Sequence, residues 1–154
     1  MNDLHSAYEI ARIINHHQGI ALIQRASIEN SWQIDIITLT EIWTSGCIIK
    51  SNLMSYLAQL DLLSSNISGE NKSILEDEHL SNMIKEKRNS LDIVVAAATL
   101  SRVVTPTLSS ASQFLNGICE CSSAANIIQA QRDFFGAHKV QTKSNGGKYV
   151  HIQW

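Results

Sequence analysis

The sequence predicts an all-α domain that is followed by an extended C-terminal tail. Its 154 residues contain one Pro and seven Gly, whereas sandwiches and barrels are rich in turn residues. Apolar residues recur mostly three or four positions apart, which is the spacing of one helix face. We therefore expect at least six helices in a domain over residues 1–138, a tail over residues 139–154, and no sizeable sheet.

The first expected helix runs from Leu4 to about Asn30. Its apolar stripe consists of Ala7, Ile10, Ala11, Ile14, Ala21 and Leu22. The polar stretch 15–18 interrupts the stripe and predicts a buried polar band at mid-helix. We interpret Asn15, His17 and Gln18 as a satisfied polar layer between helices, and the alternative is a contact at the rim of a site built elsewhere.

Two capping boxes divide the next part of the chain. Residues 38–41 and 73–76 each place Glu three positions after Thr or Ser, the spacing that begins a helix. The expected elements are a short helix from Thr38 through Trp43 with a break at Ser45-Gly46, a helical run over 48–60, a surface loop over 61–73, and a helix from there to about Arg88.

A strongly apolar segment, Leu91–Leu100, predicts a central buried helix with Val94, Ala97 and Ala98 in the core. Thr105-Pro106 either ends this helix or begins the next. The small residues 109–112 allow close helix approach. The last helix is expected from about Ser123 to Phe135, with a stop at Gly136.

The segment after His138 reads as extended chain. Residues 148–154 partly alternate between polar and apolar, and Asn145-Gly146-Gly147 predicts a turn between two arms of a hairpin. Exposed Tyr149, Ile152 and Trp154 would need another surface to cover them, because an isolated hairpin is marginally stable. A partner chain could supply this surface.

Composition excludes several classes of function. A net charge of −2 with scattered Lys and Arg offers no footprint for nucleic acid. No apolar run approaches the roughly 18 residues of a membrane span, and three cysteines, an odd number, indicate a reducing compartment such as the cytoplasm. The sequence has no Gly-x-Gly-x-x-Gly turn, P-loop, nucleophile elbow or paired Cys-x-x-Cys metal motif, so we expect neither a cofactor nor a metal bound by this chain alone.

Arg132 and His138 are the two candidate functional residues. They flank the expected helix stop at Gly136, where cations commonly complement the helix-terminal carbonyls. Alternatively, they form an anion clamp, because a guanidinium offers two parallel donors to phosphate or carboxylate and an imidazole adds another. Their spacing alone leaves both interpretations open.

The run Gln129–His138, Gln-Ala-Gln-Arg-Asp-Phe-Phe-Gly-Ala-His, resembles the C-terminal signature of decarboxylating 6-phosphogluconate dehydrogenases. Ile42-Trp43 with Gly46–Ser51, Gln18-Gly19, and Pro106 with Ser109–Ala111 are also similar to segments of that family. The resemblance covers essentially the whole chain but only the all-helical C-terminal half of the family protein, which follows a Rossmann domain. The family's catalytic lysine and glutamate have no matching segment here.

The resemblance implies a homodimer in which Arg132 and His138 reach the neighbouring subunit and bind the phosphate of 6-phosphogluconate. It also implies that the complete enzyme uses NADP in the pentose phosphate pathway. Without the coenzyme domain, whether fused or supplied by a partner chain, we expect this chain to be inactive. The rival interpretation is a stand-alone helical dimerisation module or a decayed fragment, in which both residues are merely helix-end cations.

Overall fold

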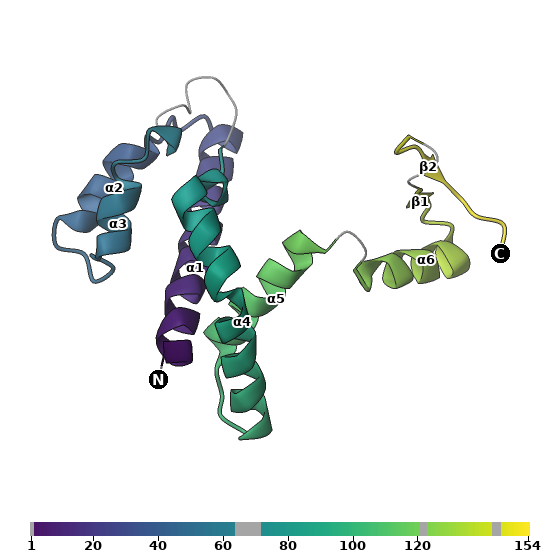
Figure 1. Ribbon diagram of the computed structural model, residues 1–154. Coiled ribbons are helices and arrows are strands. Elements are labelled where there is room, and N and C mark those ends of the chain that lie inside the picture. Colours follow the sequence, from purple (N-terminus) through teal and green to yellow (C-terminus); the bar gives the residue numbers. More distant parts are fainter. Residues whose placement is uncertain (1, 64–71, 121–122, 143–145) are drawn as a thin grey trace. The chain divides into compact units, whose positions relative to one another are not determined.

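Figure 1 shows the computed structural model, which describes residues 2–63, 72–120, 123–142 and 146–154. Its elements are α1 (Asn2–Glu29), α2 (Ile36–Thr44), α3 (Asn52–Leu57), the 3-10 helix η2 (Ile74–Glu76), α4 (Glu78–Leu100), α5 (Pro106–Cys119), α6 (Ala125–Gly136), β1 (Val140–Gln141) and β2 (Tyr149–Val150). These six α-helices confirm the all-α prediction, and the one sheet in the described residues is a two-stranded hairpin.

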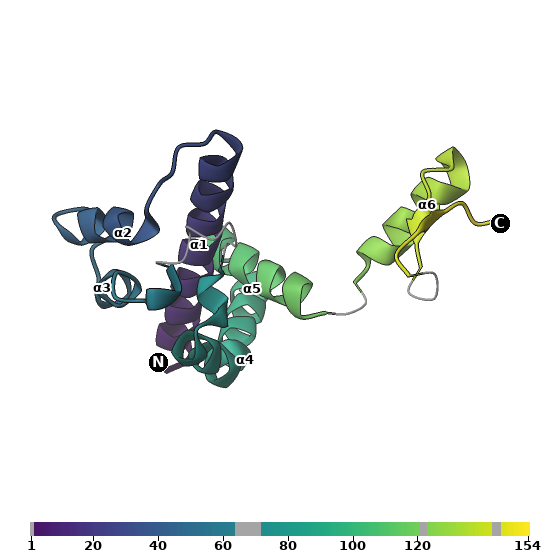
Figure 2. The ribbon, with the colours of Figure 1, turned by 90° about the horizontal axis from the view of Figure 1, so that it is seen from above.

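The chain divides into two compact units, Met1–Leu115 and Asn116–Trp154. In the first unit, α4 lies antiparallel alongside α1, as Figures 1 and 2 both show. Two polar contacts join α1 and α4. Nζ of Lys87 lies 2.7 Å from Oε2 of Glu9, and Oγ of Ser90 donates to Oδ1 of Asp3 at 2.7 Å. The hydrogen bond from Lys87 lowers the pKa of Glu9.

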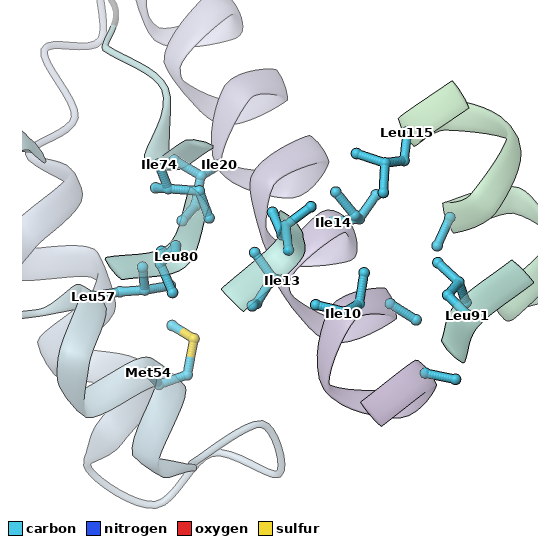
Figure 3. Packing of buried hydrophobic residues seen from close by; sticks show 14 of the residues in the cluster. Ile10, Ile13, Ile14, Ile20, Met54, Leu57, Ile74, Leu80, Leu91 and Leu115 are labelled. Atoms are coloured by element: carbon cyan, nitrogen blue, oxygen red, sulfur yellow. The ribbon is translucent and has the colours of Figure 1, made fainter. Parts of the chain in front are cut away.

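The core of the first unit is built around α1. This helix contributes more buried residues than any other described helix. Figure 3 shows Ile13 and Ile20 facing Leu57, Ile74 and Leu80, while Ile10 and Ile14 lie on the side of Leu91 and Leu115. Burial of one such aliphatic side chain contributes about 1.5–3 kcal/mol. The helix is therefore covered from two sides.

The prediction that residues 91–100 form the central buried helix is wrong. They are the last turns of the continuous 23-residue helix α4, in which Leu91 is buried but Val94 and Ala98 are only partly buried and Ala97 is exposed. Val94 and Val95 in these turns pack against the core, whereas Ile93 and Leu100 are 47% and 85% exposed. An apolar segment reports hydrophobic character, not which elements lie against it.

Several predicted boundaries also shift. Helix α2 begins after Asp35, whose carboxylate accepts the N–H groups of Ile37 and Thr38, and not at the box over 38–41. Helix α3 begins at Asn52, and Ile48 in the preceding turn is fully exposed. The box at Ser73–Glu76 is confirmed, but it caps the short helix η2, while Asp77 caps α4. Pro106 begins α5, and Ser45 caps the end of α2 as expected.

The buried polar band predicted in α1 is confined to its histidines. Asn15 and Gln18 are exposed, because they lie on the outer side of α1. His17 is half-buried, its Nδ1 lies 3.2 Å from Oγ of Ser73, and its ring centroid lies 5.6 Å from that of Phe114. Burial lowers the pKa of His17. Of the three residues predicted to form a polar layer, only His17 therefore contacts other elements of the first unit in this way.

The second unit contains α6 and the hairpin, which confirms the predicted last helix and the extended tail (Figure 1). Strands β1 and β2 pair antiparallel, with Val140 opposite Val150. Gly146 and Gly147 have φ angles of 57° and 78°, which L-residues rarely adopt. Asn145 lies outside the described residues. The domain boundary at residue 138 stays a prediction.

Candidate functional site

Both predicted site residues lie at the C-terminal end of α6 and are exposed. Nη1 of Arg132 donates to Oε1 of Gln129, one helical turn earlier, at 3.4 Å. The other end of that amide, Nε2 of Gln129, donates to the carbonyl of Lys139 at 2.7 Å. The side chain of Gln129 thus connects the guanidinium of Arg132 with the backbone that directly follows His138.

The imidazole of His138 folds back over the end of the helix. A Cβ atom added to Gly136 would lie 2.7 Å from Cδ2 and 2.8 Å from Nε2 of this ring, closer than real Cβ contacts. The ring also meets Phe135 edge-on, at 6.2 Å between centroids. The predicted stop at Gly136 is thus confirmed as the last helical residue, but Ala137 takes the left-handed cap conformation. An alanine at position 136 would therefore force the exposed ring of His138 to move.

His138 lies between two residues in the left-handed region. Ala137 has φ 49° and Lys139 has φ 65°, a conformation that costs a non-glycine residue roughly 1–2 kcal/mol. Hydrogen bonds hold this turn from both sides: the N–H of Lys139 donates to Oδ1 of Asp133 at 2.7 Å, and its carbonyl accepts from Gln129. Strain of this kind persists only where the surroundings over-determine the backbone.

The carboxylate of Asp133 contacts four groups of the second unit, and the residue is 0% exposed. Its Oδ1 accepts from the N–H of Lys139 and lies 2.9 Å from Nδ1 of His151. Its Oδ2 accepts from the N–H of Ile152 at 2.9 Å and from Nε1 of Trp154 at 3.2 Å. Burial acts to raise the pKa of Asp133, but these four hydrogen bonds outweigh it and lower the pKa to about 2.

Arg132 and His138 do not hydrogen-bond each other in the described part of the chain. The Gln129 contact uses one of the five guanidinium N–H donors, so donors remain for a ligand. Arg132 donates to the side chain of Gln129 and not to a carbonyl of the last helical turn. A helix-end cation also acts through the helix dipole without such a bond, so this contact leaves both interpretations of Arg132 open.

A groove lies in the first unit, between the start of α1 and the start of α5. This groove measures about 600 Å³ and is mostly apolar, with the guanidinium of Arg12 stacked 5.3 Å above the ring of Tyr8 at its edge. Its lining residues are Leu4, His5, Tyr8, Ala11, Arg12, Asn15, Thr107 and Leu108. Arg132 and His138 do not line it, whereas Asn15, whose alternative interpretation from the sequence is a rim contact of a site, does.

Sequence reasoning missed Asp133 and Gln129. Both stand inside the Gln129–His138 run, but no pattern in the sequence distinguishes an acid buried under the tail from one that faces solvent. The one available signal was the position of Asp133 directly after Arg132, in a helix that is followed by a tail with several N–H donors. Its partners are up to 21 residues away in the sequence, so local spacing could not reveal them.

The chain is a helical domain with two exposed basic residues, Arg132 and His138, which we call the basic corner. Beside this corner, the tail residues 151–154 contact Asp133 of α6. A family profile described as "6-phosphogluconate dehydrogenase, C-terminal domain" matches residues 1–154. Among curated relatives, the decarboxylating 6-phosphogluconate dehydrogenases of Ceratitis capitata and of Staphylococcus aureus (strain N315) are each 32% identical over the whole chain. The chain therefore belongs to the 6-phosphogluconate dehydrogenase family and corresponds to its C-terminal domain.

A solved structure agrees with this assignment. The 6-phosphogluconate dehydrogenase of Plasmodium falciparum, studied in its apo form and in complex with its cofactor NADP+ and with its substrate 6-phosphogluconate, matches 99% of this chain with a TM-score of 0.84 and 27% identity. The chain spans only about a third of the length of these relatives: 31% and 32% of the two curated proteins and 32% of the solved one.

Proposed function

We propose that this chain acts as the substrate-binding and dimerisation part of a decarboxylating 6-phosphogluconate dehydrogenase, which oxidises 6-phosphogluconate to ribulose 5-phosphate and CO2 with NADP. Arg132 and His138 bind the phosphate of the substrate. The observation that carries this proposal is the exposed pair at the end of α6, within a chain that matches the family domain over its full length. A decayed fragment or unrelated dimerisation module is not favoured by that match.

The proposed phosphate contact follows from the chemistry of the two side chains. The guanidinium of Arg132 is charged at every physiological pH and can donate two parallel N–H bonds to one phosphate. The imidazole of His138 supplies a further donor from a ring that lies against Gly136 and meets Phe135 edge-on. A charge-assisted hydrogen bond of this kind contributes about 1.5–3 kcal/mol.

The residues of this chain do not fit NADP. A dinucleotide site of the Rossmann type needs a glycine-rich turn between a strand and a helix, whereas the strands described here are the two-residue arms of a hairpin. In our proposal, the coenzyme belongs to a part of the enzyme outside this sequence. The 154 residues alone then oxidise no 6-phosphogluconate, which an assay of the purified chain with NADP tests. Robust turnover by the purified chain would refute the proposal that the coenzyme site lies outside this sequence.

We propose that the chain works as a homodimer, or alternatively beside a separate coenzyme-domain chain. One face of α6 supports this, because Ile127, Ile128, Phe134 and Phe135 are 59–74% exposed and recur at a spacing of seven residues. Tyr149 on β2 is also 66% exposed. Deletion of residues 139–154 is expected to lower the solution mass from dimer to monomer in light scattering. An unchanged mass would remove the tail from the proposed interface.

We also propose a cytoplasmic location. Cys47 and Cys119 carry free thiols, and Cys121 lies outside the described residues. Free thiols suit a reducing compartment. Separately, no described helix combines the length and the apolar character that are needed to cross a membrane.

The test of the phosphate site uses this chain fused behind the N-terminal two thirds of a relative, such as the Staphylococcus aureus enzyme. Arg132→Ala is expected to weaken binding of 6-phosphogluconate about tenfold to a hundredfold, and Arg132→Lys to restore part of it. Calorimetric titration measures both. Arg25→Ala is the matched control, since Arg25 is an exposed helical arginine that pairs with Glu29 at 2.6 Å, and it is expected to leave the affinity unchanged.

The interpretation of Arg132 as a helix-end cation makes a different forecast. A cation at a helix terminus contributes roughly 0.3–1 kcal/mol of stability and nothing to substrate affinity. Equal affinity of Arg132→Ala and wild type, together with a slightly lower melting temperature of the variant, would therefore refute the proposed phosphate site.

A further inference from the structure

We propose that Asp133 is a positioning residue that makes the arrangement of the basic corner depend on docking of the C-terminal residues 151–154. This inference rests on the proposed function for the identity of the ligand. The coupling itself rests on the contacts of one buried carboxylate. One of its oxygens binds the turn that carries His138, and the other binds the end of the tail.

The first half of the coupling is the turn. The N–H of Lys139 donates to Oδ1 of Asp133 at 2.7 Å, the shortest of the carboxylate's contacts. This bond supports the left-handed conformation of Lys139 and, one residue earlier, sets the direction in which His138 leaves the backbone. Without that acceptor, the strained turn keeps the Gln129 contact to the carbonyl of Lys139 and the backbone bond from the N–H of Ala137 to the carbonyl of Asp133.

The second half of the coupling is the tail. Oδ2 of Asp133 accepts from the backbone of Ile152 and from the indole of Trp154, and the ring of Trp154 meets Phe134 edge-on at 5.9 Å between centroids. His151 contacts Oδ1, the same oxygen that holds Lys139. Because the carboxylate is wholly buried, each of these donors stabilises its charge. Release of the tail removes three of the four.

The geometry also explains how an acid can stand next to an anion site. The charge of Asp133 is compensated by four donors and is shielded from solvent, whereas the neighbouring Arg132 is exposed and presents its guanidinium outward. The carboxylate therefore positions the corner without occupying the space in which a phosphate would bind. A ligand that binds this corner favours the docked tail, and docking of the tail favours the ligand, because such coupling is reciprocal.

Asp133→Asn tests this inference. The amide keeps the shape of the carboxylate but places an N–H2 group against N–H donors on one side, so the tail or the turn must lose its contacts. In the 154-residue chain, we expect the Trp154 indole N–H signal and the His138 ring signals to shift together in NMR spectra. In the fused enzyme, we expect KM for 6-phosphogluconate to rise roughly tenfold to a hundredfold at an unchanged kcat.

Two further variants keep the test decisive. Trp154→Phe removes one donor to Asp133 and is expected to shift the His138 signals in the same direction by a smaller amount, even if Asp133→Asn fails to fold. Gln153→Ala changes an exposed tail residue between two residues that contact Asp133, and is expected to change neither the signals nor KM.

The outcomes separate this inference from the proposed function. If Asp133→Asn moves the Trp154 signal, or Trp154→Phe moves the backbone N–H signal of Ile152, while the His138 signals and KM stay at their wild-type values, the coupling is refuted, even though the phosphate site stands. If Arg132→Ala leaves the affinity unchanged, the phosphate site is refuted, and the joint shift of His138 and Trp154 still decides the coupling. A merely structural role of Asp133 would lower the amount of active enzyme and leave KM unchanged.

Discussion

The unit that ends at Leu115 and the unit that begins at Asn116 are held together by different interactions. In the first, aliphatic side chains of other elements cover α1 from two sides, and polar contacts such as that of Lys87 with Glu9 add to this packing. In the second, one buried carboxylate gathers four donors from a turn and a tail. Apolar packing is spread over many residues, whereas in our proposal the order of the site depends on a single charge.

The largest expected effect concerns the first unit. Ile14→Ala removes a wholly buried side chain from α1 and is expected to lower the free energy of unfolding by about 2–5 kcal/mol, because it leaves a cavity. Urea unfolding followed by helical circular dichroism measures this change. Leu22→Ala, on the same helix but 70% exposed, is expected to change it by less than about 0.5 kcal/mol. Similar losses in both variants would contradict the described core.

Acid is expected to release the tail in the second unit. The pKa of Asp133 is lowered to about 2, so the contribution of its ionised form to stability is complete above the ordinary Asp pKa of about 4 and is lost as the pH falls from there through about 2. The indole N–H signal of Trp154 should report release in this window. Release that is already complete above pH 4 would contradict Asp133 as the controlling group.

A single methyl group should disturb the basic corner without disturbing its helix. Gly136→Ala places a Cβ where the His138 ring now lies, while alanine favours the helix itself by roughly 0.5–1 kcal/mol. We expect the His138 signals to move and the affinity of the fused enzyme for 6-phosphogluconate to fall about tenfold. In Gly117→Ala, the matched control on α5, the new Cβ meets nothing within 4 Å, and the affinity should not change. Unmoved His138 signals in Gly136→Ala would count against the described packing.

The smallest expected effect is a mild pH dependence of the first unit. Burial lowers the pKa of His17, so its neutral form stabilises the fold above the ordinary His pKa of about 6.5, and this contribution is lost as the pH falls below that value. Thermal melts between pH 5 and 8 should show the loss. His17→Phe should flatten the profile and His5→Gln, which changes an exposed histidine, should not. An equal slope in the His17 variant would assign the effect to another group.

The two units also differ in how much of them the sequence predicts. Helical spacing predicted α1 and α6, and turn residues predicted the hairpin, because these signals are local. The apolar character of residues 91–100 wrongly placed Ala97 in the core, since tertiary packing decides which residues of an apolar segment are covered. Arg132 and His138 came from a recognisable run of residues, but the role of Asp133 depends on donors up to 21 residues away, which no local pattern encodes.

One measurement tests the central claim most directly: titration of 6-phosphogluconate into the fused enzyme while the ring signals of its histidines are followed by NMR. We predict that His138, at the basic corner, shifts with the ligand concentration, that His17 in the first unit does not, and that Arg132→Ala moves the titration midpoint to about tenfold to a hundredfold higher concentration. A His138 signal that ignores the ligand, or a midpoint that is the same in Arg132→Ala, would contradict the account.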